Sequence, residues 1–200
     1  MNQPEIDDEP RRRTGGRSAR IRDAVLRGVL DTIVEHGPDS VTMNETARRA
    51  GVHATSIQRR WGTREKLVLD ALLAYSSEQL PVPDTGSLRD DLIAFAQALA
   101  AYLATPIGQT LTRTMSVGDD DAALAAGRAD FWQARYEVAR IIVDRAVDRR
   151  ELPDGTDPRL VIEMVIAPLH FRALLTRQSI DTELIENIVD AVERGFAQQV

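Results

Sequence analysis

The sequence predicts an all-α protein of about nine helices, in which a small N-terminal domain of three helices precedes a C-terminal helical bundle. Apolar residues recur every three or four positions along most of the chain, and no segment alternates apolar and polar residues with a period of two. Start and stop signals also divide the chain into segments of helical length. With 200 residues, 43% of them hydrophobic, the chain is long enough to bury a sizeable core.

The N-terminal segment divides into an arm and a first helix. Residues 1–16 combine acidic residues, Gly, Pro and an arginine run with almost no apolar side chains, so we expect a disordered arm. The first helix is expected over residues 17–36, where Gly37 and Pro38 stop it. Its apolar stripe recurs every four residues, at Ile21, Val25, Val29 and Ile33.

Two short helices joined by a tight turn follow. Thr42 and Glu45 can form a capping box, in which the Thr42 hydroxyl accepts from the Glu45 amide and the Glu45 carboxylate reaches back to the Thr42 amide. The helix ends at Gly51, which can take a positive φ. Ile57 and Trp61 lie one turn apart on the inner face of the next helix. Helices this short depend on packing, so the pattern predicts a helix-turn-helix whose second helix is free to enter a major groove.

The rest of the chain is expected to be helical by the same tests. Thr63, Ser87 and Asp181 are N-cap candidates, and Asp157 followed by Pro158 is a strong helix start. The helices are expected at about residues 63–80, 87–104, 106–116, 119–150 with a break near Gly127, 158–177 and 181–198. We place the functional boundary near residue 66, which gives an arm (1–16), a helix-turn-helix domain (17–66) and a C-terminal domain (67–200).

The charge of the chain is unevenly distributed. The net charge is −6, yet residues 11–66 carry 13 basic and 6 acidic residues, and residues 67–200 carry 12 basic and 21 acidic ones. A basic head on an acidic body is typical of a polyanion-binding module attached to a regulatory body. A helical protein-interaction adaptor without DNA binding is an alternative, but it leaves this basic head unexplained.

An enzyme is a weaker alternative. The chain has no cysteine, and its three histidines, His36, His53 and His170, are far apart and lie in no metal-ligand or nucleophile motif. We therefore expect no metal, no cofactor and no catalytic residue. The N-terminus lacks the apolar run of a signal peptide, and no window approaches a membrane span, so we expect a cytoplasmic protein without a membrane partner.

The stretch from Val25 to Leu72 resembles the DNA-binding domain of the TetR family of transcriptional regulators. It reads VLRGVLDTIVEHGPDSVTMNETARRAGVHATSIQRRWGTREKLVLDAL. The C-terminal part, with LPDGTDPRLVIEMVIAPLHFRALLT and a final apolar helix, looks like the ligand-binding and dimerisation half of that family. The resemblance implies a homodimeric, ligand-responsive repressor, released from a palindromic operator in double-stranded DNA by a small-molecule effector.

Carried over position by position, the resemblance implies that DNA is contacted by Thr42, His53, Ala54, Thr55, Gln58, Arg59 and Arg64. Thr42 lies at a helix start, which suits a phosphate contact. Arg64 occupies the position at which the family has a basic residue that contacts the DNA backbone. Arg59 can reach either a guanine edge or a phosphate. Gln58 stands where the family usually has a tyrosine, and Ala54 where a basic residue is common, so the operator cannot be copied from relatives.

A ligand pocket is expected between helices of the C-terminal bundle, because bundles place ligands there. Ordinary core packing is the alternative for each lining residue. The candidates fall on apolar or mixed helix faces, and they are Phe95, Leu99, Leu111, Met115, Trp132, Met164, His170 and Phe171. Arg135, one turn from Trp132, can neutralise an acidic ligand or pair with Asp or Glu, and we favour the pairing.

The last two helices have broad apolar faces that predict a homodimer interface. These faces consist of Leu160, Ile162, Val165, Ile166 and Leu169, and of Ile185, Ile188, Val189, Val192 and Phe196. The core helices of a monomer would look the same. A two-fold dimer is favoured because it reads palindromic half-sites, which a single short helix does poorly.

Overall fold

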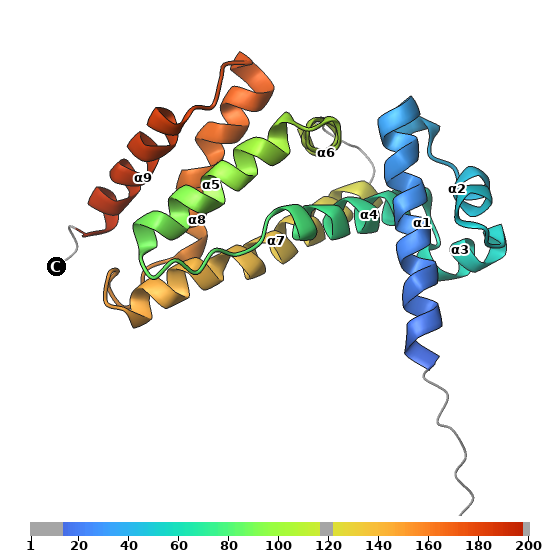
Figure 1. Ribbon diagram of the computed structural model, residues 1–200, viewed down its shortest axis with the longest axis horizontal. Coiled ribbons are helices and arrows are strands. Elements are labelled where there is room, and N and C mark those ends of the chain that lie inside the picture. The colour runs from blue at the N-terminus through green and yellow to red at the C-terminus, as the bar shows by residue number, and fades with distance from the viewer. Residues whose placement is uncertain (1–13, 117–121, 198–200) are drawn as a thin grey trace, which may run out of the picture.

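The computed structural model of the protein describes residues 14–116 and 122–197 (Figure 1). These residues form nine α-helices, one 3₁₀ turn and one π-helical turn, and contain no strand. The all-α class is confirmed. Helices α1–α3 gather at one end of the molecule, α5–α9 form a bundle at the other, and α4 runs between the two groups (Figure 1).

The N-terminal helices agree closely with those expected from the sequence. They are α1 (Thr14–His36), the 3₁₀ turn η1 (Pro38–Ser40), α2 (Met43–Ala50), α3 (Ala54–Trp61) and α4 (Arg64–Gln79). Helix α1 begins at Thr14 rather than at residue 17, and the rest of the expected arm, residues 1–13, lies outside the described residues. Gly51 ends α2 with a φ of 65°, the left-handed conformation that the turn requires.

The C-terminal helices differ from the expected ones at two points. They are α5 (Leu88–Ala104), α6 (Pro106–Ser116), α7 (Ala122–Asp148), α8 (Pro158–Phe171), the π-helical turn η2 (Arg172–Thr176) and α9 (Thr182–Ala197). The break expected near Gly127 is wrong, because α7 passes through this position. A helical glycine costs only about 1 kcal/mol, which the packing of a long helix can offset. The helix expected to reach residue 177 is α-helical only to Phe171 and widens into η2.

The capping box at α2 is only half formed. The Thr42 hydroxyl accepts from the Glu45 amide at 3.1 Å, as expected. The Glu45 carboxylate, however, accepts from Arg48 at 2.7 Å and from Arg49 at 2.8 Å instead of returning to the Thr42 amide. Charge-assisted bonds to two guanidinium groups are stronger than one bond to a backbone amide.

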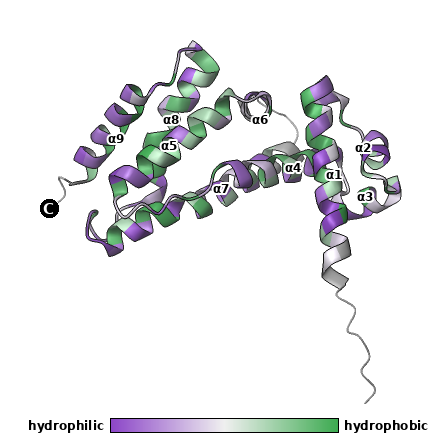
Figure 2. Cartoon of the chain, viewed as in Figure 1, coloured by the Kyte–Doolittle hydropathy of each residue, from purple (hydrophilic) through white to green (hydrophobic). Residues whose placement is uncertain are grey.

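A single apolar core extends through both ends of the molecule, and α4 contributes to it along its length. Its buried side chains include Leu67, Ala71 and Leu72. Helix α4 packs against α1 in the N-terminal group and against α7 in the bundle. Hydrophobic residues are concentrated in α5 and α8, whereas α2 and α3 carry mostly hydrophilic ones (Figure 2).

The bundle is closed at its far end by a buried carboxylate. Asp91, whose side chain is 0% exposed, accepts from the Thr85 amide at 2.6 Å and from the Thr85 hydroxyl at 2.8 Å. Arg149, just beyond α7, donates to the same carboxylate at 3.3 Å. The ion pair therefore ties the loop before α5 to the end of α7.

Among the described residues, no single helix is long and apolar enough to cross a membrane. Helix α5 and residues 106–113 of α6 satisfy that test only as a pair, and the two helices meet at 89°.

The corner between α5 and α6 depends on glycine at position 108. The Thr105 hydroxyl donates to the Tyr102 carbonyl at 2.7 Å and accepts from the Gly108 amide at 3.0 Å. A Cβ atom added to Gly108 would lie 2.0 Å from the Tyr102 carbonyl oxygen. No real contact is this short, so any side chain here must displace the backbone of α5 or α6.

We expect Gly108→Ala to lower the free energy of unfolding by about 1–3 kcal/mol, because it overpacks a backbone contact. Urea denaturation of the purified protein measures the effect. The matched control is Gly16→Ala in α1, where an added Cβ meets no atom within 4 Å. That variant should be neutral or more stable by up to about 1 kcal/mol. Equal stability of Gly108→Ala and the unaltered protein would contradict the role assigned to this corner.

Candidate functional site

Helix α3 is fixed to the core by one face and exposes the opposite face. Ile57 and Trp61 lie one turn apart and are 1% and 8% exposed. Thr55 and Arg59 are also one turn apart, on the opposite side of the helix, and both are exposed. The helix is only eight residues long, so its position is set by this packing rather than by its own stability.

A carboxylate in α4 joins three helices around α3. The Trp61 indole Nε1 donates to Asp70 Oδ2 at 2.9 Å, and Arg22 Nη2 in α1 donates to Asp70 Oδ1 at 2.6 Å. All three side chains are at least partly buried. We call this arrangement the Asp70 clasp. It fixes both the position and the rotation of α3 relative to α1 and α4.

The structure brings most of the expected DNA-contacting residues to one end of the molecule. His53 is the N-cap residue of α3, is exposed and makes no side-chain cap, while Thr42 is exposed at the start of α2. Ala54 is partly buried against the core. Gln58 is exposed, but its amide donates to the Gly62 carbonyl at the end of α3. The Gln58 side chain is therefore held by its own helix terminus in this state.

Arg64, expected to grip the DNA backbone, is engaged by protein groups. Its Nε donates to the Val41 carbonyl at 2.9 Å and its Nη2 donates to the Pro38 carbonyl at 2.5 Å. Its Nη2 also lies 3.7 Å from Asp39 Oδ1, and its Nη1 lies 3.6 Å from Glu65 Oε1. The guanidinium thus holds the loop between α1 and α2, a role that sequence position alone did not suggest. Contact of this residue with phosphate stays a prediction.

Some of the arginines at this end of the molecule are neutralised by neighbouring carboxylates. Arg48 and Arg49 bind Glu45, and these hydrogen bonds lower the pKa of Glu45 to about 2. Arg49 also donates to Glu35 at 2.7 Å. These four groups form a neutralised network on α1 and α2, so they contribute little to attracting a polyanion.

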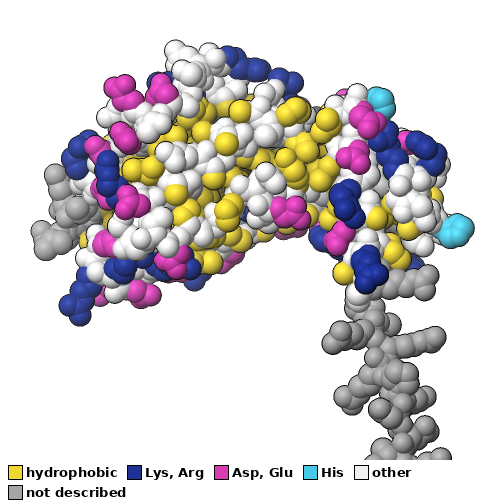
Figure 3. All heavy atoms as spheres, in the orientation of Figure 1, with side chains coloured by type: hydrophobic (Ala, Val, Ile, Leu, Met, Phe, Trp, Pro, Cys, Tyr) yellow, Lys and Arg dark blue, Asp and Glu magenta, His cyan; other side chains and the backbone are white. Residues whose placement is uncertain are grey.

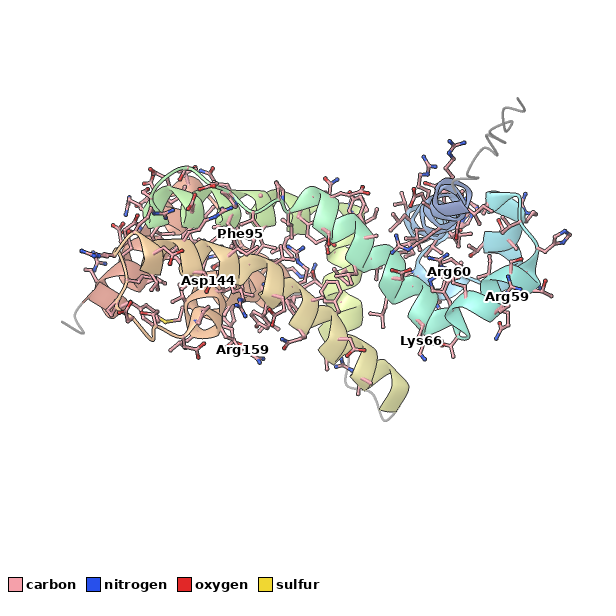
Figure 4. The ribbon with its side chains drawn as sticks, turned by 90° about the horizontal axis from the view of Figure 1, so that it is seen from below. Arg59, Arg60, Lys66, Phe95, Asp144 and Arg159 are labelled. Atoms are coloured by element: carbon pink, nitrogen blue, oxygen red, sulfur yellow. The ribbon has the colours of Figure 1, made fainter. Side chains whose placement is uncertain are left out.

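Other basic side chains at this end are exposed and are not paired with carboxylates among the described residues. Arg59 and Lys66 are exposed, and neither has an ion-pair partner among the residues that the structure describes. Arg60 stacks over the Trp61 ring at 5.2 Å. Figure 4 shows these three side chains at the end of the molecule formed by α1–α3, and Figure 3 shows Lys, Arg and His side chains on the same lobe.

Ser56, Arg60 and Lys66 are also exposed at this end of the molecule, and none of them is among the DNA contacts that the resemblance implies. The helical phase set by Ile57 and Trp61 is the signal that could have found Ser56 and Arg60, because it leaves both positions on exposed sides of α3.

A cavity of about 50 Å³ lies inside the C-terminal bundle, between α4, α5, α6, α7 and α8. Five of the expected ligand residues line it, namely Phe95, Leu99, Leu111, Trp132 and His170. Figure 4 shows Phe95 in the bundle, at the opposite end from Arg59. Residues not expected there include Ser76, Leu80, Tyr102 and Tyr136. The side chain of Met115 lies outside the described part of the structure.

Met164 and Phe171 do not line the cavity. Their side chains are 40% and 54% exposed, on the outer face of α8. The cavity face of α8 is formed instead by Ile162, Ile166 and His170, which are spaced four residues apart. Because α8 is apolar on almost every side, the sequence does not reveal which of its faces is turned inward.

Many of the residues expected at a dimer interface are buried within the subunit. This group comprises Ile162, Val165, Ile166, Leu169, Ile185, Val189, Val192 and Phe196. The large exposed apolar side chains of this region are Leu160, Met164, Phe171 and Leu175. The outward face of α8 is therefore apolar, but of the residues expected on this helix only Leu160 lies on that face, together with Met164, Phe171 and Leu175.

An open groove of about 690 Å³ adjoins the inner cavity. The two spaces share a wall formed by Thr112, Trp132, Tyr136, Ile166 and His170. Trp132 makes edge contacts with Phe131 at 5.5 Å and with His170 at 5.7 Å between ring centroids. The wall between cavity and groove is thus largely aromatic.

His170 is neutral in this wall. Its Nδ1 lies 2.9 Å from the Ile166 carbonyl, and a carbonyl only accepts, so Nδ1 carries the proton. Burial lowers the pKa of His170 below its ordinary value, which favours the neutral ring at pH 7. Its Nε2 is left as a hydrogen-bond acceptor.

Arg135 is buried in the cavity without a carboxylate. The expected pairing with Asp or Glu is wrong within the described residues: the side chain is 8% exposed, and its Nη1 has no hydrogen-bond partner. Burial lowers the pKa of Arg135. The Tyr102 hydroxyl is likewise buried and unpartnered, and burial raises the pKa of Tyr102, so the phenol stays protonated.

The described residues contain no group of three or more His, Asp or Glu side chains placed to hold a metal ion. The two candidate functional features of the described residues are an exposed short helix at one end and an aromatic cavity at the other.

We expect Asp70→Ala to lower the free energy of unfolding by about 1–3 kcal/mol, because it leaves the Trp61 and Arg22 donors partly buried without an acceptor. Thermal or urea unfolding measures the effect. Asp144→Ala is the matched control, since Asp144 accepts only from Arg140 on an exposed face of α7 (Figure 4) and should cost less than about 0.5 kcal/mol. A cost for Asp70→Ala no greater than that of the control would refute the clasp.

Comparison with known proteins covers both ends of the molecule. The family "Bacterial regulatory proteins, tetR family" matches residues 26–71, and "Tetracyclin repressor-like, C-terminal domain" matches residues 82–192. The chain is 36% identical to the HTH-type transcriptional regulator AqdR of Rhodococcus erythropolis, over 90% of this chain and 86% of that one. It is 30% identical to the DNA-binding transcriptional repressor TetR of Mycobacteroides abscessus, over 84% of this chain and 90% of that one.

Among solved structures, the TetR family transcription regulator SCO0332 is similar, with a TM-score of 0.78 and 25% identity over 88% of this chain and 98% of that one. The first family match runs from the second half of α1 to the first half of α4, and the second runs from before α5 into α9. The chain is a DNA-binding transcriptional regulator and belongs to the TetR family.

Proposed function

We propose that the protein acts as a homodimeric repressor that leaves a palindromic operator when a small molecule binds in the C-terminal bundle. The observation that carries the DNA side is α3, which buries Ile57 and Trp61 and exposes Thr55 and Arg59. The relative in Mycobacteroides abscessus, a DNA-binding transcriptional repressor by name, supports repression rather than activation.

In this proposal the exposed face of α3 enters the major groove. Thr55 and Arg59 lie at its centre, where a guanidinium can pair with guanine O6 and N7. Thr42 and His53 lie at the N-termini of α2 and α3, where backbone amides favour a phosphate. Arg60 and Lys66 add positive charge at the edges. Gln58 would have to leave the Gly62 carbonyl before its amide could pair with adenine.

Helix α4 supplies a physical link between the two ends. It starts at Arg64, which holds the loop before α2. Near its other end, Ser76 and the C-cap residue Leu80 line the cavity. Arg64 and Ser76 are about 18 Å apart along a helix axis. A ligand that needs more room than the present cavity would displace the end of α4, and a rigid helix would transmit this to α3. The ligand must bind the released state more tightly for the population to shift.

The outer face of α8 is proposed as the dimer interface, with a second copy of this chain as its partner. Leu160, Met164, Phe171 and Leu175 are 47%, 40%, 54% and 72% exposed and follow one side of α8 and η2. Helix α9 packs beside α8 and exposes the small residues Ala191 and Gly195. An apolar stripe of this size is unfavourable in water and is typical of an interface. Two-fold pairing would present two copies of α3 to a palindrome.

The DNA-reading proposal is tested by selecting fragments of the source genome that bind the purified protein, followed by affinity measurements at several salt concentrations. We expect Arg59→Ala to weaken binding to the selected operator by about 10- to 100-fold, a loss of about 1–3 kcal/mol. If Arg59 reads a base, the variant no longer discriminates between bases at one operator position. If Arg59 contacts a phosphate, the slope of the logarithm of the binding constant against the logarithm of salt concentration falls in magnitude by about one. Arg140→Ala, in α7 of the bundle, should bind as the unaltered protein does. Absence of any preference for selected over random DNA would sink the proposal.

The interface is tested with Phe171→Glu, which places a charge on the outer face of α8. We expect a dimer for the unaltered protein and a monomer for this variant in sedimentation analysis, because burying an unpaired carboxylate is strongly unfavourable. Ile141→Glu is the control, since Ile141 is an apolar residue, 38% exposed, that lies on α7 rather than on α8 or η2. Loss of the dimer in both variants, or in neither, would count against this face.

A further inference from the structure

Two hydrogen-bond donors in the inner cavity lack partners, and one of them is charged. Arg135 Nη1 and the Tyr102 hydroxyl are both buried and unpaired, in side chains that are 8% and 5% exposed. Both side chains line the same cavity, Tyr102 from α5 and Arg135 from α7. An unpaired guanidinium in such surroundings is unfavourable for folding, which indicates that its position is retained for another reason.

Four other polar side chains of the cavity wall make a hydrogen bond within the protein. The hydroxyls of Ser76 and Thr112 donate to carbonyls of their own helices, at 3.0 and 2.6 Å. Tyr136 donates to Glu163 at 3.0 Å, and His170 donates from Nδ1 to a backbone carbonyl. The fully buried donors of the cavity that lack a hydrogen-bond partner are therefore Arg135 Nη1 and the Tyr102 hydroxyl, and both require an acceptor.

The nearby acidic group of the outer groove does not supply that acceptor. Glu163 already accepts from Arg159 at 2.9 Å as well as from Tyr136. Arg159 also stacks over the Tyr136 ring at 4.7 Å, so this pair is neutralised on the groove side of the wall. The positive charge of Arg135 remains uncompensated among the described residues.

The sizes of the two spaces limit how a ligand can be arranged. About 50 Å³ in the inner cavity accommodates a head group of a few atoms, whereas about 690 Å³ in the groove accommodates a larger body. The shared wall contains Trp132 and His170, and aromatic side chains pack well against alkyl and aryl groups.

We infer that the effector is an amphipathic carboxylate, whose anionic head accepts from Arg135 and Tyr102 and whose apolar body lies along Trp132 toward the outer groove. A carboxylate suits the planar guanidinium because both its oxygens accept. This inference rests on the proposed ligand response, since it names the chemical class of the molecule that the same cavity takes.

The test is isothermal titration calorimetry of the full chain, without DNA, using octanoate, decanoate and phenylpropanoate. Each acid is compared with its primary amide, which keeps the body and removes the charge. We expect at least one acid to bind at least about tenfold more tightly than its amide. Arg135→Met should reduce binding of that acid by about tenfold or more and abolish the preference over the amide. Arg140→Met is the matched control, because Arg140 is on the same helix but exposed and paired with Glu137 and Asp144.

Thermal unfolding separates a ligand-binding role from a structural one. Removing an unpaired buried charge should leave the melting temperature of Arg135→Met unchanged or raise it. A variant that loses acid binding while remaining at least as stable supports the inference. A clear fall in melting temperature would identify Arg135 as a structural residue and overturn it.

The outcomes distinguish this inference from the proposed function. Equal binding of acids and amides, no binding of any acid, or unchanged binding by Arg135→Met overturns the inference, whatever happens at the operator. Acid binding that depends on Arg135 but does not release DNA supports the inference and contradicts the proposed ligand response.

Discussion

The packing of α4 against both ends of the molecule is the constraint on which the rest of the structure depends. Its N-terminal part is tied to α1 and α3 through Asp70, and its buried residues Leu67, Ala71 and Leu72 belong to one continuous core. Because the core is close-packed, neither α3 nor the bundle can move freely relative to this helix. The eight-residue helix α3 is held in place by the sixteen-residue helix α4, which also borders the cavity.

The elements that could be predicted from the sequence are those fixed by local chemistry. Thr42, Gly51, Thr63 and Asp157 mark helix ends because a hydroxyl, a carboxylate or a positive φ is needed there, and the structure uses each of them in this way. The buried face of α3 could also be predicted, since Ile57 and Trp61 are its large apolar residues. Gly127 shows the limit of such reasoning, because its local cost is outweighed by packing along α7.

The site was harder to predict because partners distant in sequence decide what each side chain does. Arg64 binds carbonyls of the loop before α2, more than twenty positions away. Arg135 pairs with no carboxylate of residues 14–116 or 122–197, although acidic residues are abundant nearby in sequence. The sequence predicts Met164 and Phe171 in the cavity because α8 is apolar on most sides. Only the arrangement of α5 and α7 determines which of its faces is inside.

The chain contains two tryptophans, and the fold places one at each functional end. The Trp61 indole donates to a carboxylate beside the reading helix, whereas Trp132 lies in the aromatic wall of the cavity. Indole emission depends on local polarity and on neighbouring quenching groups. The intrinsic fluorescence of this protein is therefore the sum of two local reporters, so that a spectral change on ligand addition and one on DNA addition originate from different ends of the same molecule.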